Sequence, residues 1–159
     1  MKLNLDYYKP ENDFGLKKGE EKVIEYIYAN KEKDYENIVK KDLCDDVILG
    51  LSQIRENLVK SYDFVHDSIV LEIGAHLGEK CAKVVSTDIS KKRAEAIAKR
   101  YENNDNLEII VGRPQEIKFE EKFDYITLFG VLEFAQNIFE TEDPALDLIM
   151  YCKSLLKEN

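Results

Sequence analysis

Four short runs rich in β-branched and aromatic residues constrain the fold of this chain more than any other feature. They are Ser68–Ile73, Cys81–Thr87, Leu107–Val111 and Phe123–Phe129. Continuous runs of this kind are typical of strands buried on both faces of a parallel sheet. After Ser90, a residue type that caps helices, Ala94, Ile97, Ala98 and Tyr101 recur at helical spacing. Strands alternating with helices predict an α/β fold with a doubly wound, mostly parallel sheet and right-handed crossovers.

The two ends of the chain show helical patterns. Asp143-Pro144 predicts a helix start, with Asp143 as the cap and Pro144 at the first position. The apolar stripe of that helix is Leu148, Ile149, Cys152, Leu155 and Leu156. Two further stripes in the first third are Val23, Ile24, Ile27 and Tyr28, and Val47, Ile48, Leu51, Ile54, Leu58 and Val59. We therefore predict an N-terminal helical extension over residues 1–66, packed on a core domain over residues 67–159.

Charge and composition argue against several function classes. The 159 residues carry a formal net charge of −9, whereas nucleic acids and anionic membranes bind basic faces. Two histidines and three separated cysteines, without a CxxC pair, argue against a metal site and suit a reducing compartment. No apolar run approaches the roughly 20 residues of a membrane span, and the N-terminus lacks a signal-peptide core. The sequence predicts a cytoplasmic protein without nucleic-acid partners or a membrane span.

Acidic residues and glycines follow the first two predicted strands, where ligands bind in open parallel sheets. Glu72 closes the first strand, and Gly74 and Gly78 permit a tight backbone turn. The second strand ends at Asp88, whose two carboxylate oxygens suit the two hydroxyls of a ribose. Local roles remain open for both acids: Glu72 as an acceptor for loop amides, and Asp88 as a turn or cap residue.

Taken together, these segments resemble the cofactor-binding part of class I S-adenosylmethionine-dependent methyltransferases. Glu72–Gly78 is similar to the family's E/D-x-G-x-G-x-G loop, and Val84–Ser90 to its second motif. Phe123–Ala135 resembles its fourth strand and the following loop, and Lys153–Lys157 the end of the helix before its fifth strand. The resemblance covers about residues 67–159 and implies a Rossmann-like, S-adenosylmethionine-binding domain that is incomplete at its C-terminal end. Within the family, two short segments, Leu51–Asn57 and Gly130–Ala135, look most like bacterial methyltransferases associated with cell-surface polysaccharide genes.

The resemblance implies methyl transfer from S-adenosylmethionine, with S-adenosylhomocysteine as product, to a small-molecule or saccharide acceptor. The residues it implies in cofactor binding are Glu72, Gly74, Ala75, His76, Gly78, Asp88, Ile89, Arg113, Pro114 and Phe129. Among them, Asp88 is expected to hold the ribose and Ile89 to pack on the adenine. Arg113 stands where family members often carry an acid. Glu133 is the candidate base for an alcohol acceptor, with a solvated loop acid as the alternative.

Three departures from the family pattern favour an alternative, a non-catalytic domain that serves as scaffold or as part of a longer enzyme. His76 replaces the middle glycine; it is either a proton acceptor beside the methyl donor or, as we favour, a substituted residue in a weakened site. Only residues 79–83 link the last glycine to the second strand, which shortens the first helix by about two turns. The chain ends at Asn159, so the fourth strand is left at an exposed edge. That edge predicts a homodimer or a longer protein.

A nicotinamide-dependent oxidoreductase domain is the remaining alternative. Its fingerprint would require glycines at positions 74, 76 and 79, whereas this chain has His76 and Glu79. The loop after the fourth strand also lacks an Asn-Pro-Pro-Tyr-like stretch, which argues against amino-group methylation of bases or glutamine. The sequence therefore favours methyl transfer to another acceptor, ahead of the scaffold and the oxidoreductase.

Overall fold

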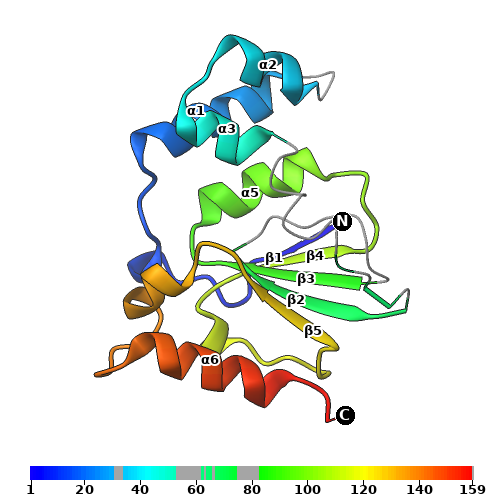
Figure 1. The fold of residues 1–159 in the computed structure, drawn as a ribbon, viewed down its shortest axis with the longest axis vertical. Helices are drawn as coiled ribbons and strands as arrows, with labels where there is room; N and C mark the ends of the chain where they lie inside the picture. The colour runs from blue at the N-terminus through cyan, green and yellow to red at the C-terminus, as the bar shows by residue number, and fades with distance from the viewer. Residues whose placement is uncertain (31–33, 53–61, 63, 66, 75–82, 159) are drawn as a thin grey trace.

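A parallel sheet forms the centre of the computed structural model, which describes residues 1–30, 34–52, 62, 64–65, 67–74 and 83–158. Within those residues the strands are β1 (Lys2–Asn4), β2 (Ile69–Ile73), β3 (Lys83–Asp88), β4 (Leu107–Val111) and β5 (Tyr125–Leu128). They lie in the order β1-β4-β3-β2-β5, and every neighbouring pair runs parallel (Figure 1). The predicted α/β fold with a parallel sheet is confirmed.

Helices cover both faces of the sheet (Figure 1). The α-helices of the described part are α1 (Lys18–Ala29), α2 (Tyr35–Lys41), α3 (Asp45–Leu51), α5 (Lys91–Arg100) and α6 (Pro144–Leu155). Its 3-10 turns are η1 (Pro10–Asn12), η3 (Pro114–Glu116) and η4 (Leu132–Asn137). No helix among these is long and apolar enough to cross a membrane.

Side chains of successive strand residues enter two separate cores, as the alternation of a strand requires. Leu71 and Val85 pack in one core with Leu148 of α6. Val84 packs in the other core with Ala94 of α5. Both faces of the central strands are therefore apolar and buried, which explains why their sequences are continuous apolar runs and confirms the doubly wound arrangement.

The N-terminal helices form a further layer on α5. Ile27, Val47 and Leu51 pack together against Ala96 of α5, and α1 to α3 lie beyond α5 from the sheet (Figure 1). Arg100 of α5 donates a hydrogen bond of 2.7 Å to the carbonyl oxygen of Gly50. The predicted apolar residues Ile54, Leu58 and Val59 lie outside the described residues. Residues of α1 thereby lie near the carboxyl ends of the strands, where Glu20 and Val23 border the same space as Asp88.

The N-terminal segment is not wholly helical, and this corrects the prediction for residues 1–66. Lys2–Asn4 forms β1 and extends the sheet beyond β4, with Leu3 opposite Ile109. A strand of three residues is too short to show a reliable alternation of apolar and polar residues. Its pairing with β4 depends on tertiary structure, because the two segments are more than a hundred positions apart in the sequence.

The predicted starts of α5 and α6 are confirmed in position, but the cap of α5 differs in its hydrogen bonding. Asp143 accepts a hydrogen bond of 3.1 Å from the Leu146 N–H, and Pro144 occupies the first turn of α6. Ser90 is the N-cap residue of α5, but its side chain makes no capping hydrogen bond. Instead its backbone N–H donates to Asp88. Ile149 and Leu156, predicted in the apolar stripe of α6, are 45% and 36% exposed, and Leu156 follows the last residue of the helix.

β5 is the fourth of the strands predicted from the sequence, and it forms one edge of the sheet, as expected. The chain after α6 runs beside the start of this strand. The Phe123 N–H donates to the Leu155 carbonyl oxygen at 3.0 Å, and the Lys157 N–H donates to the Phe123 carbonyl oxygen at 2.9 Å. A homodimer through the rest of this edge stays a prediction.

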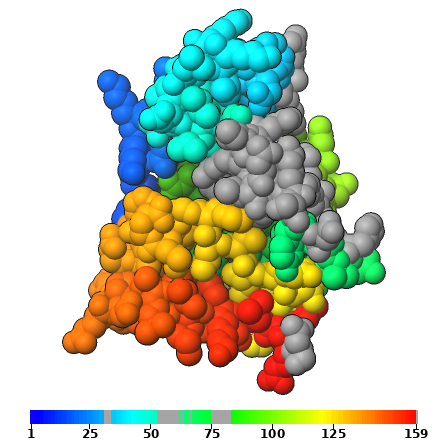
Figure 2. Space-filling view, in the orientation of Figure 1, coloured from blue at the N-terminus to red at the C-terminus, as the bar shows by residue number. Residues whose placement is uncertain are grey.

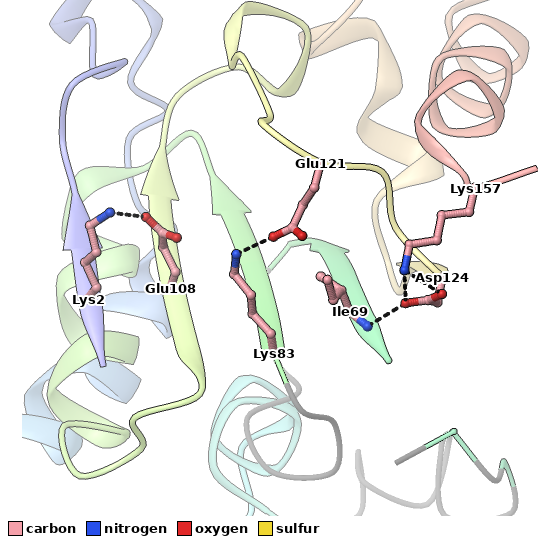
Figure 3. Close-up of polar contacts among 7 residues, drawn as sticks. All are labelled: Lys2, Ile69, Lys83, Glu108, Glu121, Asp124 and Lys157. Atoms are coloured by element: carbon pink, nitrogen blue, oxygen red, sulfur yellow. Dashed lines mark hydrogen bonds and ion pairs between the residues drawn. The ribbon is translucent and has the colours of Figure 1, made fainter. Parts of the chain in front are cut away.

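Ion pairs join the elements near the amino ends of the strands (Figure 3). Lys2 contacts Glu108 at 2.6 Å, which links β1 to β4. The Asp124 carboxylate accepts from the Ile69 N–H at 2.8 Å and from the Lys157 ammonium at 2.8 Å. This carboxylate therefore links β2, β5 and the segment after α6 at the end of the sheet opposite the strands' carboxyl ends.

Replacing Asp124 by Asn is expected to lower the melting temperature at pH 7. The Ile69 N–H and then the Lys157 ammonium hold the pKa of Asp124 below its ordinary value. A carboxylate whose pKa is depressed on folding stabilises the protein above its unfolded pKa of about 3.9 and loses that contribution as the pH falls. The difference between the two melting temperatures should therefore shrink from pH 6 to pH 3. Glu121→Gln, at an exposed ion pair, is the control and should change little. A deficit that does not vary with pH would contradict this assignment.

Candidate functional site

A cleft of about 690 Å³ lies at the carboxyl ends of the strands. This volume is typical of sites for small molecules and cofactors. The loops after β2, β3, β4 and β5 form its floor, and residues of α1, α3, α5 and η4 form its walls. In the space-filling view, α2 and α3 (cyan) lie towards one end of the molecule, and α6 (orange to red) towards the other (Figure 2). The loops that line the cleft follow four of the five described strands, so the cleft lies where these strands end.

Glycines form the floor where the backbone turns sharply. Gly74, directly after β2, has a φ of +83°, and a Cβ atom there would lie 2.7 Å from Val131 Cγ2. Its N–H donates to the Thr87 carbonyl oxygen at 3.0 Å. Gly130, after β5, also has a positive φ of +65°. Both turns use the left-handed conformation that glycine adopts without steric cost.

Three of the predicted cofactor residues, Ala75, His76 and Gly78, lie outside the described residues, as do positions 79–82 of the short crossover. Their predicted roles stay predictions. The two interpretations of His76, as a proton acceptor or as a substituted residue in a weakened site, also stay predictions.

Glu72 lies within the sheet. The residue is 1% exposed, and its Oε2 accepts a hydrogen bond of 2.7 Å from the Ser86 hydroxyl of β3. It is absent from the described residues that line the cleft. The structure therefore gives Glu72 a contact that joins β2 to β3, and its predicted contact with a cofactor stays a prediction.

Asp88 lies at the end of β3 and lines the cleft, but its carboxylate is already engaged. Oδ1 accepts from the Ser90 N–H at 2.8 Å and from Arg93 Nη2 at 3.1 Å, and Oδ2 accepts from Arg93 Nε at 2.8 Å. The Asp88 side chain is 5% exposed. The neighbouring Ile89 is half-buried and also lines the cleft. Asp88 therefore lies at the end of its strand, as predicted, with the Arg93 guanidinium bound to its carboxylate.

Arg93 also contacts the wall of the cleft. Its Nη1 donates to Glu20 Oε1 of α1 at 2.8 Å, so one guanidinium joins Asp88 to Glu20. Burial lowers the pKa of Arg93, but the charges of Asp88 and Glu20 outweigh burial and raise that pKa above its ordinary value. We call Glu20, Arg93 and Asp88 the arginine bridge. The sequence analysis missed it, because no motif links Glu20 to Asp88.

Of the two predicted cofactor residues in the turn after β4, Pro114 lines the cleft and Arg113 does not. Pro114 is buried and lines the cleft, and its carbonyl oxygen accepts a hydrogen bond of 2.5 Å from the Tyr151 hydroxyl. Burial raises the pKa of Tyr151 to about 12, so this hydroxyl stays protonated as a donor. Arg113 is absent from the described lining residues and lies 3.8 Å from a carboxylate oxygen of Glu140.

The loop after β5 forms the remaining wall. Phe129 and Glu133 both line the cleft, and the side of η4 that carries Glu133 is exposed. The ammonium of Lys17 lies 5.2 Å from the ring centroid of Phe134, so the chain just before α1 contacts η4. The structure therefore brings six predicted residues together at one cleft: Gly74, Asp88, Ile89, Pro114, Phe129 and Glu133.

Comparisons with known proteins assign the chain to a family. A family model described as a methyltransferase domain matches residues 60–149, more than half of the chain. A search of curated protein sequences finds no match.

Among solved structures, the chain is similar to a SAM-dependent methyltransferase from Thiobacillus denitrificans in complex with S-adenosyl-L-homocysteine. The identity is 16% and the TM-score 0.51, over 67% of this chain and 44% of that chain. It is also similar to 23S rRNA methyltransferase ErmE, at 16% identity and a TM-score of 0.41, over 52% of this chain and 38% of that one. A third is phosphoethanolamine N-methyltransferase 1 from Haemonchus contortus, at 18% identity and a TM-score of 0.44, over 67% and 25%. This chain spans less than half the length of each.

Proposed function

Because this chain belongs to the methyltransferase domain family, we propose that its cleft binds S-adenosylmethionine and that the protein transfers the methyl group to a small-molecule or saccharide acceptor. One observation carries the proposal: the glycine turn at Gly74 and the carboxylate of Asp88 meet in the same cleft, at the ends of adjacent strands. This is the place where open parallel sheets bind nucleotide-like ligands.

The residues of the cleft fit such a cofactor. Gly74 leaves its backbone accessible where a side chain would collide with Val131. Asp88 offers two oxygens in one plane for the two ribose hydroxyls. Ile89, Pro114 and Phe129 supply apolar surface for the adenine. When bound, the cofactor supplies an electrophilic methyl group on a sulfonium.

Holding and orienting the two reactants is the main task left to the protein, because a well-aligned displacement gains most of its rate from positioning. Glu133 lines the cleft on the exposed side of η4. If the acceptor is an alcohol, we expect the Glu133 carboxylate to accept the proton of its hydroxyl group.

Calorimetric titration of the protein with S-adenosylmethionine and S-adenosylhomocysteine tests the proposal. We expect dissociation constants in the micromolar range and a raised melting temperature, because a ligand that binds only the folded state stabilises it. NAD should neither bind comparably nor displace S-adenosylhomocysteine. If neither compound gives heat or a thermal shift, the proposal is wrong and a scaffold role is supported. Displacement by NAD would support the oxidoreductase instead.

A further inference from the structure

The carboxylate that the proposed function assigns to the ribose is occupied by a side chain of the protein itself. Arg93 donates two hydrogen bonds to Asp88, one to each oxygen, at 2.8 and 3.1 Å. The Ser90 N–H donates a third, to Oδ1. A carboxylate has about four lone-pair positions, so little acceptor capacity remains on Asp88. A diol that needs both oxygens must therefore displace at least part of the guanidinium.

The contacts of Arg93 have the geometry of a strong interaction. A guanidinium that binds both oxygens of one carboxylate matches it in shape as well as charge. The Asp88 side chain is 5% exposed, so water and salt screen this pair weakly. The remaining Arg93 contact, to Glu20 at 2.8 Å, is more open, because the side chains of Arg93 and Glu20 are 30% and 31% exposed.

The contact with Glu20 gives Arg93 a second place to bind when it leaves Asp88. Both Glu20 and Arg93 line the cleft, as Asp88 does. A guanidinium has five N–H donors, and those released from Asp88 remain close to the carboxylate of Glu20. The positive charge can thus stay paired after the ligand has bound Asp88, which keeps the exchange from leaving a half-buried cation without a partner.

We propose that Arg93 is an internal competitor of the cofactor: its guanidinium binds Asp88 and must move towards Glu20 before the ribose can bind. Arg93 is thereby a residue that sets cofactor affinity without contacting the reacting atoms. This inference rests on the proposed function, since it concerns the ligand assigned to the same cleft. The apparent affinity of a ligand falls in proportion to the fraction of protein that is competent to bind it.

Titration of Arg93→Met with S-adenosylhomocysteine tests the competition. Methionine keeps an unbranched apolar side chain suited to a helix and removes the guanidinium. We expect binding to tighten by roughly tenfold, as when about one molecule in ten has Asp88 available before the change. Lys92→Met is the matched control: Lys92 is exposed on the same helix, and the change removes the same charge. It should leave the affinity within about twofold, as expected of an exposed charge.

Two further variants separate competition from structural effects. Adding Arg93→Met to Asp88→Asn should give no tightening, because the competition acts only through the carboxylate. Glu20→Gln keeps both hydrogen bonds between Arg93 and Asp88, so its affinity should not rise. Melting curves of each variant establish that it is folded.

The outcomes distinguish the inference from the proposed function. If the unaltered protein binds S-adenosylhomocysteine but Arg93→Met binds equally or more weakly, the competition is wrong and the proposed function stands. Tightening by Glu20→Gln to the same extent would also overturn the competition at Asp88. If no variant binds the compound, the proposed function is wrong and this inference falls with it.

Discussion

Replacing Asp88 by Asn is expected to weaken the binding of S-adenosylhomocysteine by about 100-fold. Two hydrogen bonds from ribose hydroxyls to a carboxylate contribute about 1.5–3 kcal/mol each, and 1.4 kcal/mol corresponds to tenfold in affinity. Asparagine keeps one oxygen, replaces the other by a donor and removes the charge. Because Arg93 also loses its hold on this side chain, the net effect should be smaller than the sum of the two bonds.

Asp46→Asn is the matched control for this measurement. Asp46 belongs to α3, is exposed and lines the same cleft. The same chemical change there should leave the affinity within about threefold, as expected of an exposed carboxylate outside the ribose site. Calorimetry of both variants, with circular dichroism to establish that they are folded, decides the matter. Equal losses in the two variants would contradict the assignment of Asp88 to the ribose.

Replacing Gly74 by Ala is expected to lower the free energy of unfolding by about 2–5 kcal/mol and to abolish detectable cofactor binding. A side chain at φ +83° costs about 1–2 kcal/mol in backbone strain. The new methyl group would lie 2.7 Å from Val131 Cγ2, and overpacking of this kind costs about 1–3 kcal/mol. Relief of the collision would move the loop that is expected to border the cofactor.

Gly15→Ala provides the control, because Gly15 also lines the cleft and a Cβ atom there meets nothing within 4 Å. Urea unfolding of the two variants measures the difference in stability, and titration measures binding. The control should unfold within about 0.5 kcal/mol of the unaltered protein, as most surface substitutions do. Should Gly74→Ala match it in both measurements, neither the positive φ nor the contact with Val131 constrains this loop.

Much of the fold was predictable because it depends on local rules. The apolar runs that became β2 to β5 reflect strands buried on both faces, a property of each segment alone. Asp143 and Pro144 start α6 through hydrogen bonding and backbone geometry within a single turn. The placement of Asp88 beside Gly74 follows from parallel pairing, which brings the carboxyl ends of neighbouring strands to one edge.

Other features were not visible in the sequence, because they arise where distant segments pack. β1 pairs with β4 across most of the chain. The contact between Arg113 and Glu140 joins the turn after β4 to the segment before α6; the predicted role of Arg113 at the adenine edge stays a prediction. Glu72 accepts a hydrogen bond from the Ser86 hydroxyl on the neighbouring strand, a partner that its position in the sequence did not reveal. In each case the side chain's surroundings come from another element, so its residue type and neighbours in sequence do not determine its contacts.

The sequence by itself determined the parallel sheet, its helices and the acid and glycine that follow adjacent strands, because steric and hydrogen-bonding periodicities act over a few residues. Only the tertiary structure decided that α1 would form a wall of the cleft and that Arg93 would join Asp88 to Glu20, 73 positions earlier in the chain. Such a contact depends on how a helical layer packs on α5, and that packing is the sum of many apolar contacts among distant segments.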